Sequence, residues 1–297
     1  MTKNTWVLAG VLAALVIIAY LVMQRPGESS APESSGKMLV DFDSSAVDRI
    51  EVRAPGGATV LERQGGAWMV TSPVRYRADD VTVGAALSAG KRIELSGLVS
   101  SNPAKRGLFQ LDSTGTLVSI FEHGAAKAVF WIGKPSTSYT ETYVRREGSD
   151  EVYLATGMFS STFTRHTSDW RDKTIFKTDQ DAIGQVTLRF GDTTVVLARQ
   201  DSVWKVGDEA AKNDAVKSFT GALANLQADD FIDTAVANMP PLVVQIEVAG
   251  TQIRFYQEKG ADKFTVQTSA SPQLFQVYNW KGAQLVKRKK DFLAGAA

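Results

Sequence analysis

AVDRIEVR, residues 46–53, and AIGQVTLR, residues 182–189, stand 136 positions apart and share one pattern. Both segments alternate apolar and polar side chains, as half-buried β-strands do. A gapless alignment at this offset, from Ala46 to Leu87, contains ten identical pairs among its 42 positions, whereas average composition would give roughly three. The pairs include Trp68 with Trp204. The pattern indicates an internal duplication into two similar domains.

Each copy predicts the same order of elements. Three short strands separated by turn residues come first, at 46–53, 58–64 and 67–71 in the first copy. A helix follows in both, with Asp79 or Asp80 as the expected N-cap in the first copy and Asn213 or Asp214 in the second. Four further strands and a short terminal helix complete each copy. The expected fold class is α+β: an N-terminal transmembrane helix and two tandem homologous β-rich domains, with antiparallel sheets and covering helices.

The N-terminus predicts a membrane anchor. Residues 6–23 carry no charge, and as a helix they would extend roughly 27 Å, close to the hydrocarbon thickness of a bilayer. Lys3 before this segment and Arg25 after it give a weak bias toward a cytoplasmic N-terminus. A cleaved signal peptide is the alternative, although its apolar core would be shorter. The predicted anchor residues are Trp6, Leu8, Leu12, Leu15, Ile18 and Leu21.

These segments define the predicted domain organisation. Residues 1–25 form the anchor, and residues 26–37, which are rich in Ser, Pro, Glu and Gly, form a flexible linker. The first β-rich domain spans 38–177 and the second spans 178–297. The predicted location is the bacterial inner membrane, as a single-pass protein with its bulk in the periplasm.

Composition excludes several classes of function. A formal net charge of +1 gives no overall attraction to nucleic acid, and we expect no nucleic-acid partner. The absence of cysteine excludes disulfides, thiolate nucleophiles and cysteine-based metal sites. The two histidines, His123 and His166, meet no metal-ligand spacing. IGKPS, residues 132–136, lacks the upstream glycine of a phosphate loop and is expected to be a hairpin turn. No cofactor, metal or catalytic residue is predicted.

Four longer phrases carry a family resemblance. They are VDRIEVR (47–53), VLERQGGAWMVTSPV (60–74), WIGKPSTSYTETYVRREGSDEVYLA (131–155) and DWRDKTIF (169–176). Together they resemble a bacterial domain of unknown function found in tandem behind one membrane helix. The resemblance covers almost all of residues 38–295. It implies an association with the permease, the ATPase and the auxiliary subunits of a gliding-motility-type ABC transporter. The second copy lacks the IGK motif and has RKKDF in place of WRDK.

Arginines gather in the first copy, and they are the candidate partner contacts. They are Arg145, Arg146, Arg165 and Arg171. Asp169 and Asp172 lie near them in sequence, so the alternative is a set of internal ion pairs that fix the terminal helix to the sheet. Trp68 and Trp204 are expected to be repeated core anchors, with a ligand platform as the alternative. The basic run at 287–290 is expected to be a solvated face, with acidic lipid or an acidic partner as the alternative.

These features favour a non-enzymatic function. The first hypothesis is a membrane-anchored, periplasm-facing accessory subunit of an ABC-type transport or envelope complex, which binds its partners through sheet edges and loops. The lipid bilayer is the second expected partner, through the N-terminal helix. An envelope structural or carbohydrate-binding protein unrelated to transport is the alternative. A membrane-tethered hydrolase based on His166 is the second alternative.

Overall fold

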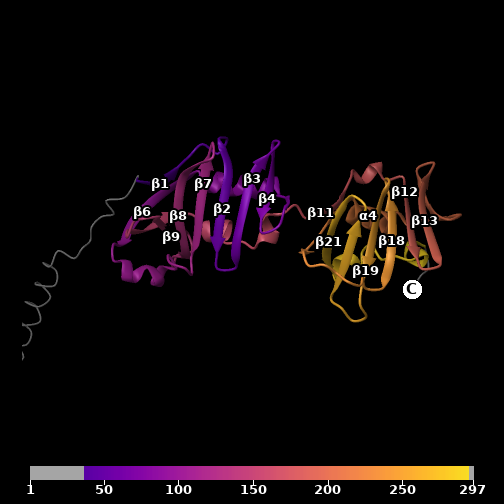
Figure 1. Cartoon of the computed structure of the whole chain (residues 1–297). Coiled ribbons are helices and arrows are strands. Elements are labelled where there is room, and N and C mark those ends of the chain that lie inside the picture. Colours follow the sequence, from indigo (N-terminus) through magenta and orange to yellow (C-terminus); the bar gives the residue numbers. More distant parts are fainter. Residues whose placement is uncertain (1–36, 294–297) are drawn as a thin grey trace, which may run out of the picture. The chain divides into compact units, whose positions relative to one another are not determined.

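The computed structural model describes residues 37–293, which are mostly β-sheet with a few short helices (Figure 1). Strand pairs in all of the sheets are antiparallel, so the predicted α+β class is confirmed in this coarse form. The predicted anchor residues and most of the predicted linker lie outside the described residues. Within residues 37–293, no helix combines the length and the apolar character that crossing a bilayer requires.

The described chain divides into two compact units. The first contains residues 37–60 and 84–165, and the second contains residues 61–83 and 166–293. The predicted domain boundary between residues 177 and 178 stays a prediction.

A ten-stranded sheet has the order β1-β6-β10-β9-β8-β7-β2-β3-β4-β5. Its strands are β1 Met38–Asp41, β2 Val47–Ala54, β3 Gly57–Gln64, β4 Ala67–Ser72, β5 Tyr76–Arg77, β6 Arg92–Ser100, β7 Thr116–Glu122, β8 Ala125–Pro135, β9 Glu141–Arg146 and β10 Val152–Thr156. The accompanying helices are α2 Asp80–Gly90, the 3-10 helix η1 Pro103–Phe109, α3 Phe159–Phe163 and the 3-10 helix η2 Thr167–Trp170.

A nine-stranded sheet has the order β15-β14-β13-β12-β18-β19-β20-β21-β17, and β11 pairs with β16 in a separate two-stranded sheet. The strands are β11 Thr174–Lys177, β12 Gln185–Phe190, β13 Thr193–Gln200, β14 Val203–Val206, β15 Glu209–Ala210, β16 Asn225–Gln227, β17 Asp230–Ile232, β18 Leu242–Val248, β19 Thr251–Tyr256, β20 Lys263–Thr268 and β21 Ser271–Tyr278. The helices are the 3-10 helix η3 Gln180–Ala182, α4 Asn213–Ala224, α5 Asn279–Gly282 and α6 Lys289–Phe292.

Both large sheets contain the same succession of pairings. In the first, β7 and β2 are followed by β3, β4 and β5, and in the second, β18 and β12 are followed by β13, β14 and β15. Ile50 lies opposite Ile120 in the first sheet, and Val186 lies opposite Val248 in the second. The strands predicted from period-two alternation form in both halves, because each has one apolar face to bury.

The core of the second unit lies between the nine-stranded sheet and α4. Inward side chains of the sheet, among them Val186, Leu188 and Phe255, pack with Val216 and Phe219 of the helix. The outward side chains of the same strands are polar, which is the alternation expected for a sheet with one buried face.

The predicted helix caps have different outcomes. Asp79 caps α2, since its carboxylate accepts a hydrogen bond of 2.6 Å from the backbone N–H of Thr82. The predicted cap at Asn213 or Asp214 is wrong, because α4 begins at Asn213 and its N-cap is Lys212, which makes no side-chain cap bond. The backbone N–H of Lys212 instead donates to Phe292 O at 2.8 Å, so a tertiary contact fixes this helix start.

The paired tryptophans occupy equivalent strands. Trp68 lies on β4 and is buried, which confirms a core anchor. Trp204 on β14 is half-buried and packs against the core of the second unit. A guanidinium lies over each ring, from Arg63 at 5.2 Å and from Arg199 at 5.8 Å. The stack of arginine on tryptophan therefore recurs at the same 136-residue offset.

Candidate partner-contact site

Arg145 lies over the ring of Trp131 on the neighbouring strand. β8 and β9 pair with Trp131 opposite Arg145, and directly opposite residues project from the same face of a sheet. The Arg145 guanidinium is 5.3 Å from the ring centroid, within the range of a cation–π interaction. The indole N–H of Trp131 donates to the carboxylate of Glu147, which fixes the ring under the guanidinium.

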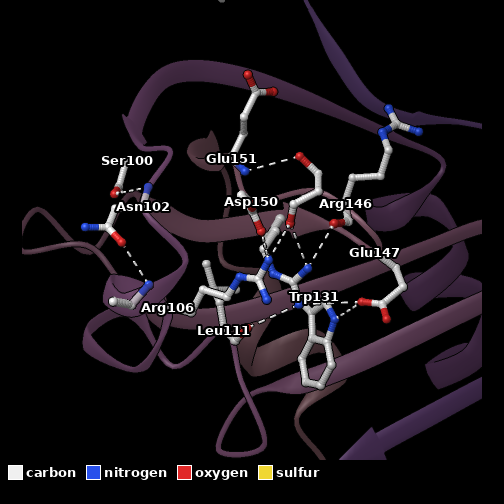
Figure 2. Close-up of polar contacts among 12 residues, drawn as sticks. Ser100, Asn102, Arg106, Leu111, Trp131, Arg146, Glu147, Asp150 and Glu151 are labelled. Carbon is white, nitrogen blue, oxygen red and sulfur yellow. Dashed lines mark hydrogen bonds and ion pairs between the residues drawn. The ribbon is translucent and has the colours of Figure 1, made fainter.

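The donors of Arg145 bind backbone carbonyl groups and, through Nη2, the Glu147 carboxylate at 3.5 Å. Figure 2 shows Glu147 beside the Trp131 ring that lies under this guanidinium. Nη1 donates to Ser149 O at 3.0 Å, and Nη2 donates to Leu111 O at 3.3 Å. Burial lowers the pKa of Arg145, and the nearby charge of Arg106 lowers it further. The guanidinium stays charged because arginine begins from so high a pKa. Arg145 is only 4% exposed. Through its hydrogen bonds to Ser149 O and Leu111 O, it ties the β9–β10 turn to the loop that contains Leu111.

Arg106 is the second arginine of this site, and sequence reasoning missed it. It lies on η1, forms an ion pair with Asp150 and donates to Ser149 O at 3.3 Å. A local signal was present, because Asn102 followed by proline is an N-cap signature. The Asn102 side chain accepts a hydrogen bond of 3.0 Å from Ala104 N. The cap therefore defines η1, and Arg106 fastens η1 to the turn.

Gly133 allows the segment after η1 to approach the sheet. Residues 132–135 belong to strand β8, so the predicted hairpin turn at IGKPS is wrong, and the turn follows at 136–140. A Cβ at Gly133 would overlap the carbonyl oxygen of Phe109 and lie 3.1 Å from the Leu111 side chain. Glycine at this position therefore brings Leu111 O within reach of Arg145.

The exposed part of this site is the η1 surface, which we define by Lys105, Leu108, Glu147 and Asp150. Leu108 is 63% exposed, and the side chains of Glu147 and Asp150 are 47% and 55% exposed. The buried Arg145 and the half-buried Arg106 hold this irregular loop in one conformation. An apolar side chain beside fixed charges is suited to recognising another protein.

Arg146 and Arg165 make separate contacts. Arg146 follows Arg145 on β9, so its side chain projects to the opposite face, where Nη2 donates to Leu39 O at 2.5 Å and Met38 O at 3.3 Å. Nε of Arg165 donates to Thr162 O at 2.7 Å. Their predicted role in partner contact stays a prediction, as does that of Arg145 and Arg171.

Arg171 is buried in the second unit. Its Nη1 lies 2.9 Å and 2.8 Å from the two carboxylate oxygens of Asp233, and its Nη2 donates to Gln273 at 3.0 Å. The guanidinium lies 3.6 Å from the ring centroid of Phe231 and 4.6 Å from that of Tyr76. All the polar partners come from remote parts of the sequence.

The expectation that Asp169 and Asp172 pair with the candidate arginines is wrong. Asp169 pairs with Lys173 at 2.8 Å, and Asp172 lies 4.0 Å from Arg77. That expectation rested on closeness in sequence, whereas in the structure the carboxylate bound by Arg171 is that of Asp233.

The two histidines lie apart from these contacts. His123 is in the β7–β8 turn, with a φ of 52°. His166 is exposed and precedes η2. Within the described range, no group of three His, Asp or Glu side chains is placed to hold a metal ion.

Comparison with known proteins gives a family. The family model described as a domain of unknown function, DUF4340, matches residues 68–242, which include Arg106, Arg145 and Arg171. No curated protein and no solved structure matches the chain. Since the matched segment covers more than half of the 297 residues, the chain belongs to the DUF4340 family.

Proposed function

We propose that this protein is a membrane-anchored, non-catalytic accessory subunit of an ABC-type transport or envelope complex, and that its β units face the periplasm. The observation that carries the proposal is the η1 surface. Arg145, which is buried, and Arg106 donate hydrogen bonds that fix a loop whose own side chains remain exposed. Such a loop presents a rigid recognition surface at little ordering cost when a partner binds.

Two other observations support the proposal. The common strand order of the large sheets and the 136-residue repeat support a duplicated scaffold of two homologous domains. The uncharged segment at 6–23 supports a single membrane helix. The link to a transporter rests on the family resemblance.

Co-purification tests this function. The full chain, tagged at its C-terminus, is isolated from membranes in mild detergent, and its partners are identified by mass spectrometry. Leu108→Asp should reduce recovery of permease and ATPase subunits by about tenfold or more, because it places a charge in the centre of the contact. Leu242→Asp is the matched control, since Leu242 is 47% exposed in the second unit. Isolation of the bare chain would contradict the proposal.

The outer face of the nine-stranded sheet favours a second candidate, an envelope glycan-binding protein. Arg254 donates to Gln245 at 2.8 Å and to Gln252 at 3.1 Å, and Glu247 pairs with Arg189 at 3.1 Å. Ordered amide and charged groups of this kind match sugar hydroxyls. Binding of soluble peptidoglycan fragments that is lost in Arg254→Ala would support it, and unchanged binding in that variant would contradict it.

A further inference from the structure

A groove of about 500 Å³ runs beside β11 in the second unit. Its walls come from β5 and from the starts of β19 and β21, represented by Tyr76, Thr251 and Ser271. Its charged groups are Arg77, Asp172 and Lys177. None of these residues belongs to the η1 surface.

The groove follows the edge of a strand. Thr174, Ile175, Phe176 and Lys177 all line it. Side chains alternate between the two faces of a strand, so a hollow touched by four consecutive residues lies along the strand's edge and not over one face.

No strand of the described chain pairs with the backbone groups on that edge, although the N–H of Thr174 donates to the Asp172 carboxylate at 2.9 Å. The groups left for an added strand are the C=O of Thr174 and the peptide groups of Lys177. β11 pairs with β16 on its other side, where Lys173 O accepts a hydrogen bond from Ala228 N and Thr178 N donates to Ala224 O. Because peptide groups alternate in direction along an antiparallel strand, those of Thr174 and Lys177 point away from β16. No strand in residues 37–293 pairs with the groove side of β11. Exposed edges of this kind accept an added strand.

One wall of the groove is held in place, and among its described residues the charge without an ion pair is that of Lys177. The Arg171 guanidinium lies 4.6 Å from the Tyr76 ring, and so holds that wall in place. Arg77 is partly neutralised by Asp80 at 3.1 Å and by Asp172 at 4.0 Å. Lys177 is exposed, and no ion pair is observed for it within the described chain. An acidic group of a ligand would therefore be drawn to the Lys177 end.

We infer that this groove binds an extended, acidic segment of a partner protein by adding it as a strand to β11. The four residues of β11 span about 13 Å, which matches a segment of about four residues. Main-chain hydrogen bonds would supply affinity, and the charge of Lys177 would select acidic segments. The inference rests on the proposed function, since it names the chemistry of one partner contact.

Crosslinking in cells tests the inference. A photoreactive amino acid replaces Lys177 in the full chain, and the same replacement at Lys259, an exposed lysine in the β19–β20 turn, is the matched control. We expect an adduct at position 177 whose mapped partner peptide is extended and acidic, and none of that composition at position 259. An adduct that maps to residues 1–36 of the same chain, or no adduct above the control, would overturn the inference.

Charge reversal gives a second measurement. Lys177→Glu should lower recovery of the crosslinked partner about tenfold, whereas Lys259→Glu should leave it unchanged. Equal recovery in the two variants would overturn the inference. Retention of transporter subunits without crosslinks at position 177 would reject the groove and leave the proposed function standing. Loss of those subunits with an acidic adduct at position 177 would reject the transporter and keep the groove.

Discussion

The ion pair of Arg171 and Asp233 tests how much the burial of a charge matters for the stability of the second unit, because its two members differ in exposure. The Arg171 side chain is 1% exposed, whereas that of Asp233 is 40% exposed. Removing one member of a buried ion pair costs about 3–5 kcal/mol, chiefly because the other charge stays buried without its partner. After Arg171→Met, Asp233 can be hydrated, and the methionine can pack between the rings of Tyr76 and Phe231. After Asp233→Asn, the buried guanidinium keeps its charge and cannot be hydrated.

Asp233→Asn should therefore destabilise the protein more than Arg171→Met. We expect losses of about 4 kcal/mol and about 2–3 kcal/mol respectively. The double variant should lose less than the sum of the two, because the charge left buried in one single variant is absent. At the size of this chain, 1 kcal/mol shifts Tm by roughly 2–4 °C, so Asp233→Asn should lower Tm by roughly 8–16 °C.

Thermal unfolding of the full chain in mild detergent, followed by tryptophan fluorescence, measures these differences. Arg189→Met is the matched control, because its pair with Glu247 at 3.1 Å is 53% and 29% exposed and should contribute less than about 1 kcal/mol. If Arg171→Met lowered Tm no more than this control, or more than Asp233→Asn does, the reasoning from desolvation would be refuted.

Two further predictions concern the first unit. Gly133→Ala should displace the segment that passes over it, because the new Cβ would overlap Phe109 O. Hydrogen exchange across residues 103–111 should accelerate, whereas Gly84→Ala, at a site with nothing within 4 Å, should leave it unchanged. Burial and the hydrogen bond to Glu151 raise the pKa of Tyr153 to about 12. Since the folded pKa is the higher one, the stabilising contribution of Tyr153 is complete below the unfolded value of about 10 and is lost between about pH 10 and about pH 12. Tyr153→Phe should remove this part of the fall in Tm at alkaline pH. If the dependence of Tm on pH were the same in the variant, the raised pKa of Tyr153 would be contradicted.

The strands with one buried face could be predicted from sequence. AVDRIEVR and AIGQVTLR form β2 and β12 because their alternation matches the pleat. Strands with weaker alternation were missed. β6 contains two register shifts against β10, and its alternation of polar and apolar residues stops at Gly97. β1, β11 and β17 are four residues or shorter, which is too short for a periodic signal.

The candidate site could be predicted only in part, because its contacts are tertiary. Arginine density pointed to Arg145, but nothing in its neighbourhood named Leu111 O, which lies 34 positions away and accepts its hydrogen bond. IGK resembles a turn by composition, since glycine followed by lysine is common in loops. Gly133 is instead a strand residue whose missing side chain admits another segment. A glycine needed for close approach and a glycine needed for a turn look alike in one sequence.

The two large sheets share a strand order, yet only one of them carries the η1 surface. Ile50 of the first sheet and Val186 of the second are equivalent positions. When the strand pairings are followed from them across each sheet, Arg254 occupies the position of Trp131. Gln267 then occupies the position of Arg145. The connection before β7, residues 101–115, contains η1, whereas the one before β18, residues 233–241, is shorter and contains no helix. Without a covering loop, Arg254 and Gln267 line an open hollow. At this position of the sheet a buried arginine accompanies a loop that must be fastened, and the second sheet, which has no such loop, has neither WIGK nor the arginine pair. Because the loops differ while the strand order is shared, the two halves should contact different partners, and substitutions on the η1 surface should not be rescued by the second unit.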